Sequence, residues 1–176
     1  MHLSEQEIIR RQAKDQLEAM GIDPYPSELY KISHQAAEIK ASYTEGKAED
    51  FKEVSLAGRI MSRRIMGSAS FAEIQDSSGR IQIYFRRDDL CPEEDKTMYN
   101  TVFKKLLDIG DIIGIKGFVF TTKVGEISVH VTEFKILTKS LKPLPIVKES
   151  VDEKGEKHVH DAFQDSELRY RQRYVD

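Results

Sequence analysis

The chain has 176 residues, of which 39% are hydrophobic, and its formal net charge is −3. This length and composition suffice for one domain of ordinary size with extensions and one modest core, whereas the negative charge argues against a protein that coats nucleic acid through bulk positive charge. Apolar runs are only a few residues long and charges occur throughout the N-terminus, so we expect a cytoplasmic protein with neither a membrane span nor a secretory signal.

The first segment carries the signals of a helix. Ser4 followed by Glu7 forms a capping-box pattern, and Gly21 supplies a C-terminal cap. Between these signals, apolar residues recur at near-helical spacing: Ile9, Ala13, Leu17 and Met20. Three basic residues are expected on the exposed side, where they solvate the helix or touch a phosphate backbone: Arg10, Arg11 and Lys14. A second helix is predicted over about residues 33–43, followed by a polar linker over residues 45–50.

The pattern of a long strand begins at Val54, where apolar residues alternate with polar ones. The predicted buried set is Val54, Leu56, Gly58 and Ile60. The same alternation turns Arg59 and Arg63 outward. The small Gly58 suits a bend in the strand.

Two further strands meet at a strong turn signal, Asp76-Ser77-Ser78-Gly79. Before the turn, Ala72 and Ile74 share one face and Phe71 takes the other. After the turn, the inward set is Ile81, Ile83 and Phe85, which leaves Gln82 outside. Strand parity therefore places Phe71 and Gln82 on one outer surface. A slip by one residue would bring Phe71 into the core, but it would also expose Ile74.

The spacing of apolar residues changes from that of a strand to that of a helix after Pro92. Two lanes of apolar residues at helical spacing predict one core helix: Met98, Val102 and Leu106 beside Tyr99, Phe103 and Leu107. A fourth strand begins near Ile113, and a turn at residues 123–125 returns the chain as a fifth strand to Leu137. Three strands, a helix and two strands is the order of an OB-fold, a five-stranded, partly open barrel. An up-and-down sheet or a split βαβ domain fits less well, because neither explains the long first strand.

The surface that holds Phe71 and Gln82 suggests a ligand. An aromatic ring on the wet face of a small sheet is a platform for an unstacked base, and OB-folds usually bind on the face of strands two and three. Two acid-free stretches add positive charges, although such clusters are more often an ordinary solvated face: Arg59, Arg63, Arg64, Arg80, Arg86 and Arg87. Single-stranded nucleic acid is therefore the first partner to test.

Several short motifs resemble the N-terminal anticodon-binding domain of class II lysyl-tRNA synthetases. Within the expected barrel they are Arg63–Gly67 with Ser70-Phe71, Ile74–Asp76, Gly79–Gln82, Gly110–Ile112 and Gly125-Glu126. Two more, Leu137–Pro145 and Arg169–Asp176, are similar to that family's exit from the barrel and entry to its catalytic domain. The resemblance covers most of the chain and is weakest over residues 22–53 and 146–163.

The resemblance implies specific roles in binding the anticodon loop of tRNA(Lys). Phe71 matches a phenylalanine that stacks on an anticodon base, and Gln82 matches a glutamine that reads the central uridine. Glu126 matches an acid that helps to select the adjacent base, where a carboxylate can accept the uridine N3–H. Three arginines would hold phosphates, which adds affinity without sequence choice: Arg59, Arg63 and Arg64.

The family also implies a larger enzyme around this chain. We expect residues 1–50 to be a helical extension, residues 51–145 the anticodon-binding barrel, and residues 146–176 a linker that enters a missing catalytic domain through a final helix. The complete enzyme of this family is a homodimer that uses ATP and Mg2+ to charge lysine onto its tRNA. No catalytic residue, cofactor or metal site is expected in residues 1–176: the single cysteine, Cys91, and the spacing of the histidines exclude a thiolate or histidine zinc cluster.

Three alternatives remain at this point. A free-standing OB protein could bind single strands without sequence choice, although more stacking aromatics and a net basic surface would then be expected. The N-terminal helices could chiefly mediate dimer or protein contacts. The aspartyl- and asparaginyl-tRNA synthetases share the barrel and the central uridine, but the barrel-exit and tail motifs favour lysine.

Overall fold

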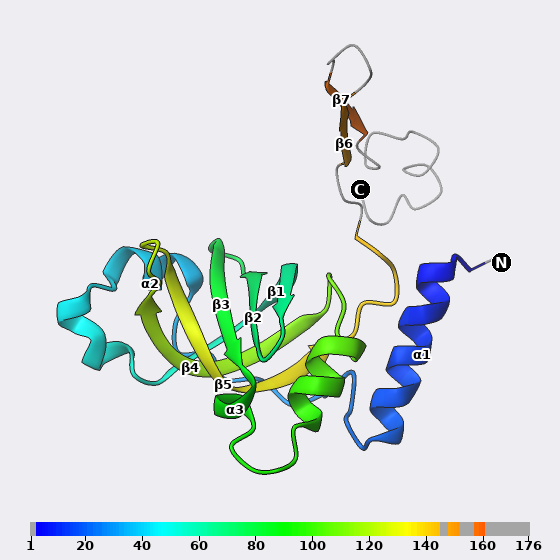
Figure 1. Ribbon diagram of the computed structural model, residues 1–176, viewed down its shortest axis with the longest axis horizontal. Helices are drawn as coiled ribbons and strands as arrows, with labels where there is room; N and C mark the ends of the chain where they lie inside the picture. The colour runs from blue at the N-terminus through cyan, green and yellow to red at the C-terminus, as the bar shows by residue number, and fades with distance from the viewer. Residues whose placement is uncertain (1–2, 145–147, 152–156, 161–176) are drawn as a thin grey trace. The chain divides into compact units, whose positions relative to one another are not determined.

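The computed structural model describes residues 3–144, 148–151 and 157–160 (Figure 1). The chain forms two compact units, Met1–Lys142 and Pro143–Asp176. In the second unit, β6 (Lys148–Val151) and β7 (Lys157–His160) pair as an antiparallel hairpin. The helix predicted near the C-terminus lies outside the described residues.

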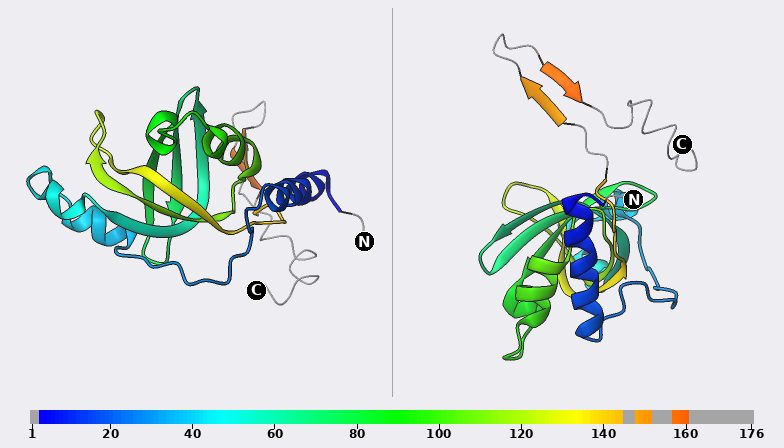
Figure 2. Two further views of the ribbon diagram at one scale, coloured as in Figure 1. Left: turned by 90° about the horizontal axis from the view of Figure 1, so that it is seen from below. Right: turned by 90° about the vertical axis from the view of Figure 1, so that its right-hand side faces the viewer.

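A closed five-stranded barrel is the centre of the first unit (Figures 1 and 2). Its strands are β1 (Val54–Met66), β2 (Ala69–Gln75), β3 (Arg80–Arg86), β4 (Ile112–Thr121) and β5 (Ile127–Thr138). Their order around the barrel is β1-β2-β3-β5-β4, with β3 and β5 parallel and the other neighbours antiparallel. Pairing of β4 with β1 closes the ring. This confirms the predicted five-stranded OB-fold.

Alternate residues of each strand fill the barrel, as the sequence periodicity predicted. On β2, Ala72 and Ile74 are buried, whereas Phe71 between them is only partly covered. On β3, Ile81 and Ile83 are buried and Gln82 between them is likewise only partly covered. The register of β2 and β3 therefore has the predicted parity, and the one-residue slip that would have buried Phe71 does not occur.

A π-helix, η2 (Met98–Leu106), covers one end of the barrel (Figure 1). The Leu107 backbone N–H donates to the Val102 carbonyl at 3.0 Å, five residues back. The Phe103 ring packs against the Phe85 ring in the core, with centroids 4.1 Å apart. The predicted core helix is thus confirmed, but the short helix α3 (Arg87–Leu90) precedes it in the interval where one helix was expected.

The predicted first helix is confirmed as α1 (Glu5–Ala19), capped by reciprocal hydrogen bonds between Ser4 and Glu7. It lies beside η2, with Ala13 and Leu17 buried (Figure 2). The expectation that Arg10 lies on the exposed side is wrong, because Arg10 precedes Ala13 by three residues and shares its stripe. The Arg10 guanidinium is buried and donates to the carbonyls of Ile109 at 2.9 Å and Ser140 at 3.0 Å.

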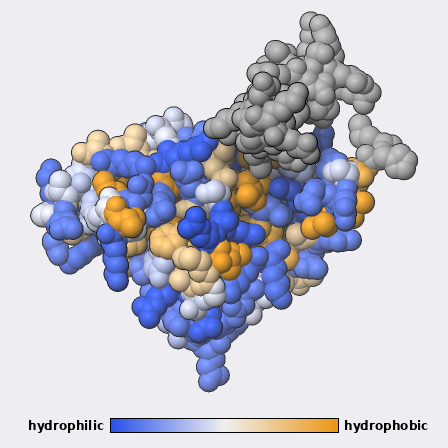
Figure 3. Space-filling model, turned by 45° about the horizontal axis from the view of Figure 1, so that its top comes forward, coloured by the Kyte–Doolittle hydropathy of each residue, from blue (hydrophilic) through white to orange (hydrophobic). Residues whose placement is uncertain are grey.

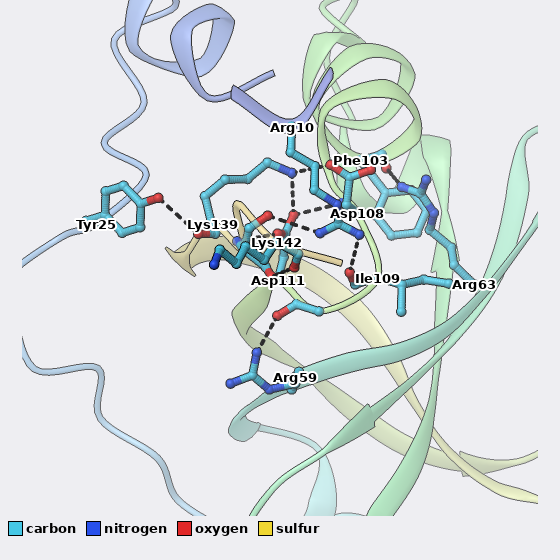
Figure 4. A network of polar contacts seen from close by, with 12 residues as sticks. Arg10, Tyr25, Arg59, Arg63, Phe103, Asp108, Ile109, Asp111, Lys139 and Lys142 are labelled. Atoms are coloured by element: carbon cyan, nitrogen blue, oxygen red, sulfur yellow. Dashed lines mark hydrogen bonds and ion pairs between the residues drawn. The ribbon is translucent and has the colours of Figure 1, made fainter. Parts of the chain in front are cut away.

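A buried polar network joins this helix to the end of the barrel (Figure 4). The Lys139 ammonium, which is fully buried, donates to Asp108 at 2.5 Å and to Asp111 at 2.8 Å. Burial raises the pKa of the Asp111 carboxyl above its usual value, although Lys139 and the backbone N–H groups of Asp108 and Ser140 act against that shift. Because each buried charge has partners, the network fixes the loop before β4 and the segment after β5.

The second helix and the linker differ in length from the expectation. α2 (Ala36–Ser42) is shorter than residues 33–43, because Gln35 is extended and forms its N-terminal cap. The expected polar linker is instead the 3-10 helix η1 (Glu45–Phe51). Asp76 in the β2–β3 turn accepts from the Ala36 backbone N–H at 2.7 Å, which ties α2 to the barrel. Within the described residues, no helix is both long and apolar enough to cross a bilayer.

An irregularity in β1 changes which arginines face outward. Ile60 pairs with Ile74 but Ser62 pairs with Glu73, so Met61 is an extra residue and the side-chain alternation shifts by one. Arg63 consequently lies opposite the inward-facing Ala72. The expectation that Arg63 turns outward together with Arg59 is therefore wrong.

Gly117 on β4 offers a test of barrel closure. A Cβ at this position would lie 1.8 Å from the backbone oxygen of His130, which cannot move without shifting β5. We expect Gly117→Ala to lower the free energy of unfolding by about 2–4 kcal/mol. Gly46→Ala is the matched control, because nothing lies within 4 Å of its added Cβ. Urea unfolding of both variants checks this, and equal stability of the two would contradict the close approach of β4 and β5.

Candidate nucleic-acid interface

Two rows of side chains cross the outer face of the barrel. The strand registers align Phe71, Tyr84, His130 and Phe118 in one row, and Glu73, Gln82, Ser128 and Phe120 in the next. The rows run from β2 through β3 and β5 to β4. Phe71 and Gln82 therefore lie diagonally across a strand pair, within reach of a single ligand.

A groove of about 720 Å³ opens over the β2–β3 end of these rows. It is lined by the end of β1, by β2 and β3, and by the β4–β5 hairpin: Ser62, Arg63, Arg64, Phe71, Ala72, Glu73, Gln82, Thr122, Val124 and Glu126. Its volume is that of a small-ligand site, and its lining includes two acidic and two arginine side chains. The groove thus brings together five of the six predicted site residues.

Phe71 packs against a second aromatic ring on the same face of the sheet. Its centroid lies 4.9 Å from that of Tyr84, and Tyr84 in turn lies 5.0 Å from the His130 ring. Tyr84 lies directly opposite Phe71 in the pairing of β2 with β3. Such support restricts the ring while its other side faces the groove, which favours stacking of a planar base.

Gln82 is held by a residue that sequence reasoning missed. The hydroxyl of Ser128 donates to the Gln82 Oε1 atom at 2.9 Å. Ser128 is fully buried although it lies on the outer face, because Gln82 and Phe120 flank it. Strand parity could have placed Ser128 on this face, but the parallel pairing of β3 with β5 that brings it to Gln82 has no local signal.

Glu126 enters the groove from the start of β5. Its backbone N–H donates to the Thr122 hydroxyl at 3.0 Å, which closes the β4–β5 hairpin. Its carboxylate lies 3.4 Å from the Lys40 ammonium on α2, with both side chains about half exposed. The partner cation therefore comes from α2 and not from the hairpin that carries Glu126. An exposed ion pair of this kind is weak and leaves the carboxylate able to bind a ligand.

The six arginines singled out in the sequence differ in their hydrogen-bond and ion-pair partners. Several have acid or amide partners: Arg80 contacts Glu73 and Gln75, Arg86 contacts Asp89, and Arg87 contacts Asp88. Arg59 donates to the Gly110 carbonyl at 2.7 Å and lines a separate hollow. The structure does not bring Arg59 into the groove.

Arg63 and Arg64 both line the groove but differ in their surroundings. Arg63 donates to the Phe103 carbonyl and lies over the Phe103 ring, 5.7 Å from its centroid. Burial lowers the pKa of the Arg63 guanidinium. Arg64 is exposed, lies opposite Phe71, and makes no ion pair within the described part of the chain. Arg64 is therefore the cation best placed to meet a phosphate.

Comparison with known proteins shows which family the barrel resembles. Residues 54–137 match the family of OB-fold nucleic acid binding domains of the anticodon-binding type. The match begins at the first residue of β1 and ends one residue before the end of β5. The barrel of this chain is therefore similar to that family over almost its whole length.

The whole chain is also homologous to the N-terminal part of lysine–tRNA ligases. It is 56% identical over 176 residues to the lysine–tRNA ligase of Porphyromonas gingivalis and 55% identical over 174 residues to that of Azobacteroides pseudotrichonymphae. The lysine–tRNA ligase of Christiangramia forsetii is 53% identical over 174 residues. The chain spans 30%, 33% and 29% of the lengths of these three relatives.

The two neighbouring arginines allow a matched comparison. Arg63→Ala removes a hydrogen bond to a core helix and a cation above an aromatic ring, so we expect it to lower the free energy of unfolding by about 1–2 kcal/mol. Arg64→Ala removes an exposed side chain and should change stability by less than about 0.5 kcal/mol. Thermal unfolding of both variants measures the difference. A larger loss for Arg64→Ala would contradict the shifted alternation of β1.

Proposed function

We propose that this chain is the tRNA-binding N-terminal domain of a lysine–tRNA ligase and that its groove takes the anticodon loop of tRNA(Lys). The observation that carries the proposal is the convergence of Phe71, Gln82 and Glu126 on one groove. These residues come from β2, β3 and the β4–β5 hairpin, and each supplies a different kind of contact. A stacking ring, an amide and a carboxylate together suit unstacked bases of a loop.

Each residue has a distinct proposed role. Phe71 stacks on an anticodon base, which contributes about 1–3 kcal/mol. Gln82 contacts the central uridine, and Glu126 accepts a hydrogen bond from the neighbouring base. Arg64 binds a phosphate, with a lesser contribution from the partly engaged Arg63. A phosphate contact by Arg59 would have to lie outside the groove, since Arg59 lines another hollow.

The activity of the whole protein is part of the same proposal. A lysine–tRNA ligase joins lysine to its tRNA at the expense of ATP, and we propose a cytoplasmic homodimer that uses Mg2+ for this reaction. Within the described residues, no cluster of three or more His, Cys, Asp or Glu side chains could hold a metal ion. We propose that ATP, Mg2+ and catalysis belong to the part of the protein that corresponds to the remaining length of these relatives.

Binding without sequence choice fits the groove less well. Two of its lining residues, Glu73 and Glu126, are acids, and a carboxylate repels the phosphates that such binding depends on. On the face shown in Figure 3, hydrophobic side chains form separate patches among hydrophilic ones. The relatives named above are ligases for lysine, which disfavours the aspartate and asparagine alternatives.

Titration with labelled anticodon stem-loops tests the proposal. We expect Phe71→Ala to weaken binding of the tRNA(Lys) loop by roughly 5- to 150-fold, which corresponds to the loss of one stacked base. Gln82→Ala should relax the choice at the central position more than it weakens binding of any loop.

Phe118→Ala is the matched aromatic control, because Phe118 is exposed on the same face but does not line the groove. It should bind like the unmodified protein. Equal affinity for the tRNA(Lys) loop and a scrambled loop at matched salt would show binding without sequence choice. Absence of binding to either loop would favour a role in protein contacts.

A further inference from the structure

The hydroxyl of Ser128 has two acceptors and one proton. Gln82 Oε1 lies 2.9 Å from it and the Glu126 carbonyl oxygen lies 3.3 Å from it. The shorter contact has the length of a normal O–H···O hydrogen bond, and the longer one exceeds that range. A buried hydroxyl loses free energy if its proton is unpaired, so the proton of Ser128 is directed to Gln82.

This contact fixes the orientation of the Gln82 carboxamide, that is, which side its oxygen and its nitrogen occupy. Oε1 contacts Ser128, and Gln82 also lines the groove, so the Nε2 group is the end of the amide left for a ligand there. Within the described residues, Nε2 makes no hydrogen bond to another protein group. Gln82 therefore offers the groove two N–H donors and keeps its acceptor for the protein.

We propose that Ser128 is a positioning residue that makes Gln82 a hydrogen-bond donor to the central base, so that the groove selects a base with a carbonyl group over one with an amino group. Uracil carries the O4 acceptor where cytosine carries the N4 amino donor. An N–H donor pairs with the former and leaves two donors facing each other with the latter. This inference rests on the proposed function, because it requires that Gln82 contact the central base.

The opposite amide orientation would read uridine differently. If Ser128 donated to the Glu126 carbonyl, the Gln82 amide could turn and offer Oε1 to the groove. An acceptor there could take the N3–H of uracil, which cytosine lacks. Both orientations thus prefer uridine, but through a donor in one case and an acceptor in the other.

Gln82→Glu separates these two mechanisms. One carboxylate oxygen can accept from Ser128 as Oε1 does, and the other then faces the groove as an acceptor in place of a donor. Stem-loops with uridine or cytosine at the central position provide the measurement, as the ratio of their dissociation constants. We expect a preference for uridine in the unmodified protein of roughly tenfold to change to a preference for cytosine in Gln82→Glu. A variant that keeps or increases the uridine preference would overturn the proposal.

Substitution of Ser128 itself supplies the second test. Ser128→Ala frees the amide to turn, so we expect the uridine-to-cytosine ratio to fall by about fivefold or more while the melting temperature changes little. Ser128→Thr keeps the hydroxyl and should retain the ratio. An unchanged ratio in a folded Ser128→Ala protein contradicts the role of Ser128. If Ser128→Ala does not fold, Gln82→Glu still decides the question, because it leaves Ser128 in place.

Failure of the proposed function has a different signature. If the unmodified protein binds uridine and cytosine loops equally, Gln82 does not read the central base, and both the assignment and the inference fail. If it prefers uridine and only the variants depart from expectation, the function stands and the role of Ser128 is wrong.

Discussion

The parallel pairing of β3 with β5 is the constraint on which the groove depends. Phe71 and Gln82 lie on a local hairpin and would share a face in any antiparallel pair of this register. Ser128 reaches Gln82 only because β5 lies along β3, with Gln82 opposite Ser128. The same pairing brings the hairpin that carries Glu126 over the groove. A contact between strands distant in the sequence thus joins the aromatic row to the polar groups proposed to discriminate between bases.

The extra residue in β1 gives two neighbouring arginines, Arg63 and Arg64, different surroundings. Without it, strict alternation would send Arg63 outward and Arg64 toward the barrel. With it, the Arg63 stem and guanidinium cover Phe103, and Arg64 stands opposite Phe71 on the outer face. A bulge costs a ladder hydrogen bond and bends the strand. Here it places the Arg64 cation opposite Phe71, where the proposed phosphate contact would be made.

Sequence reasoning succeeded where the relevant interaction is local and failed where it is not. Periodicity of two placed Phe71 and Gln82 correctly, and the capping box marked the start of α1. The orientation of Arg63 was not predicted, because the residues around Met61 carry no composition signal for a bulge. The burial of Arg10 was not predicted, because its partners are backbone carbonyls 99 and 130 residues away in the sequence. Ser128 was missed for the same reason, since its contact with Gln82 spans 46 residues.

The charges around the groove favour discrimination between bases over nonspecific affinity for the phosphate backbone. Phosphate contacts supply affinity without sequence information, and base contacts supply the choice. Most of the candidate arginines are engaged by neighbouring acids or carbonyls, which leaves Arg64 and part of Arg63 for phosphates. Glu73 and Glu126 further reduce the attraction for any polyanion. If the groove takes an anticodon loop as proposed, a loop whose bases do not fit would bind weakly, and discrimination would rest on stacking and on hydrogen bonds with defined direction. In that arrangement a buried hydroxyl that orients one amide affects recognition more than another surface cation would.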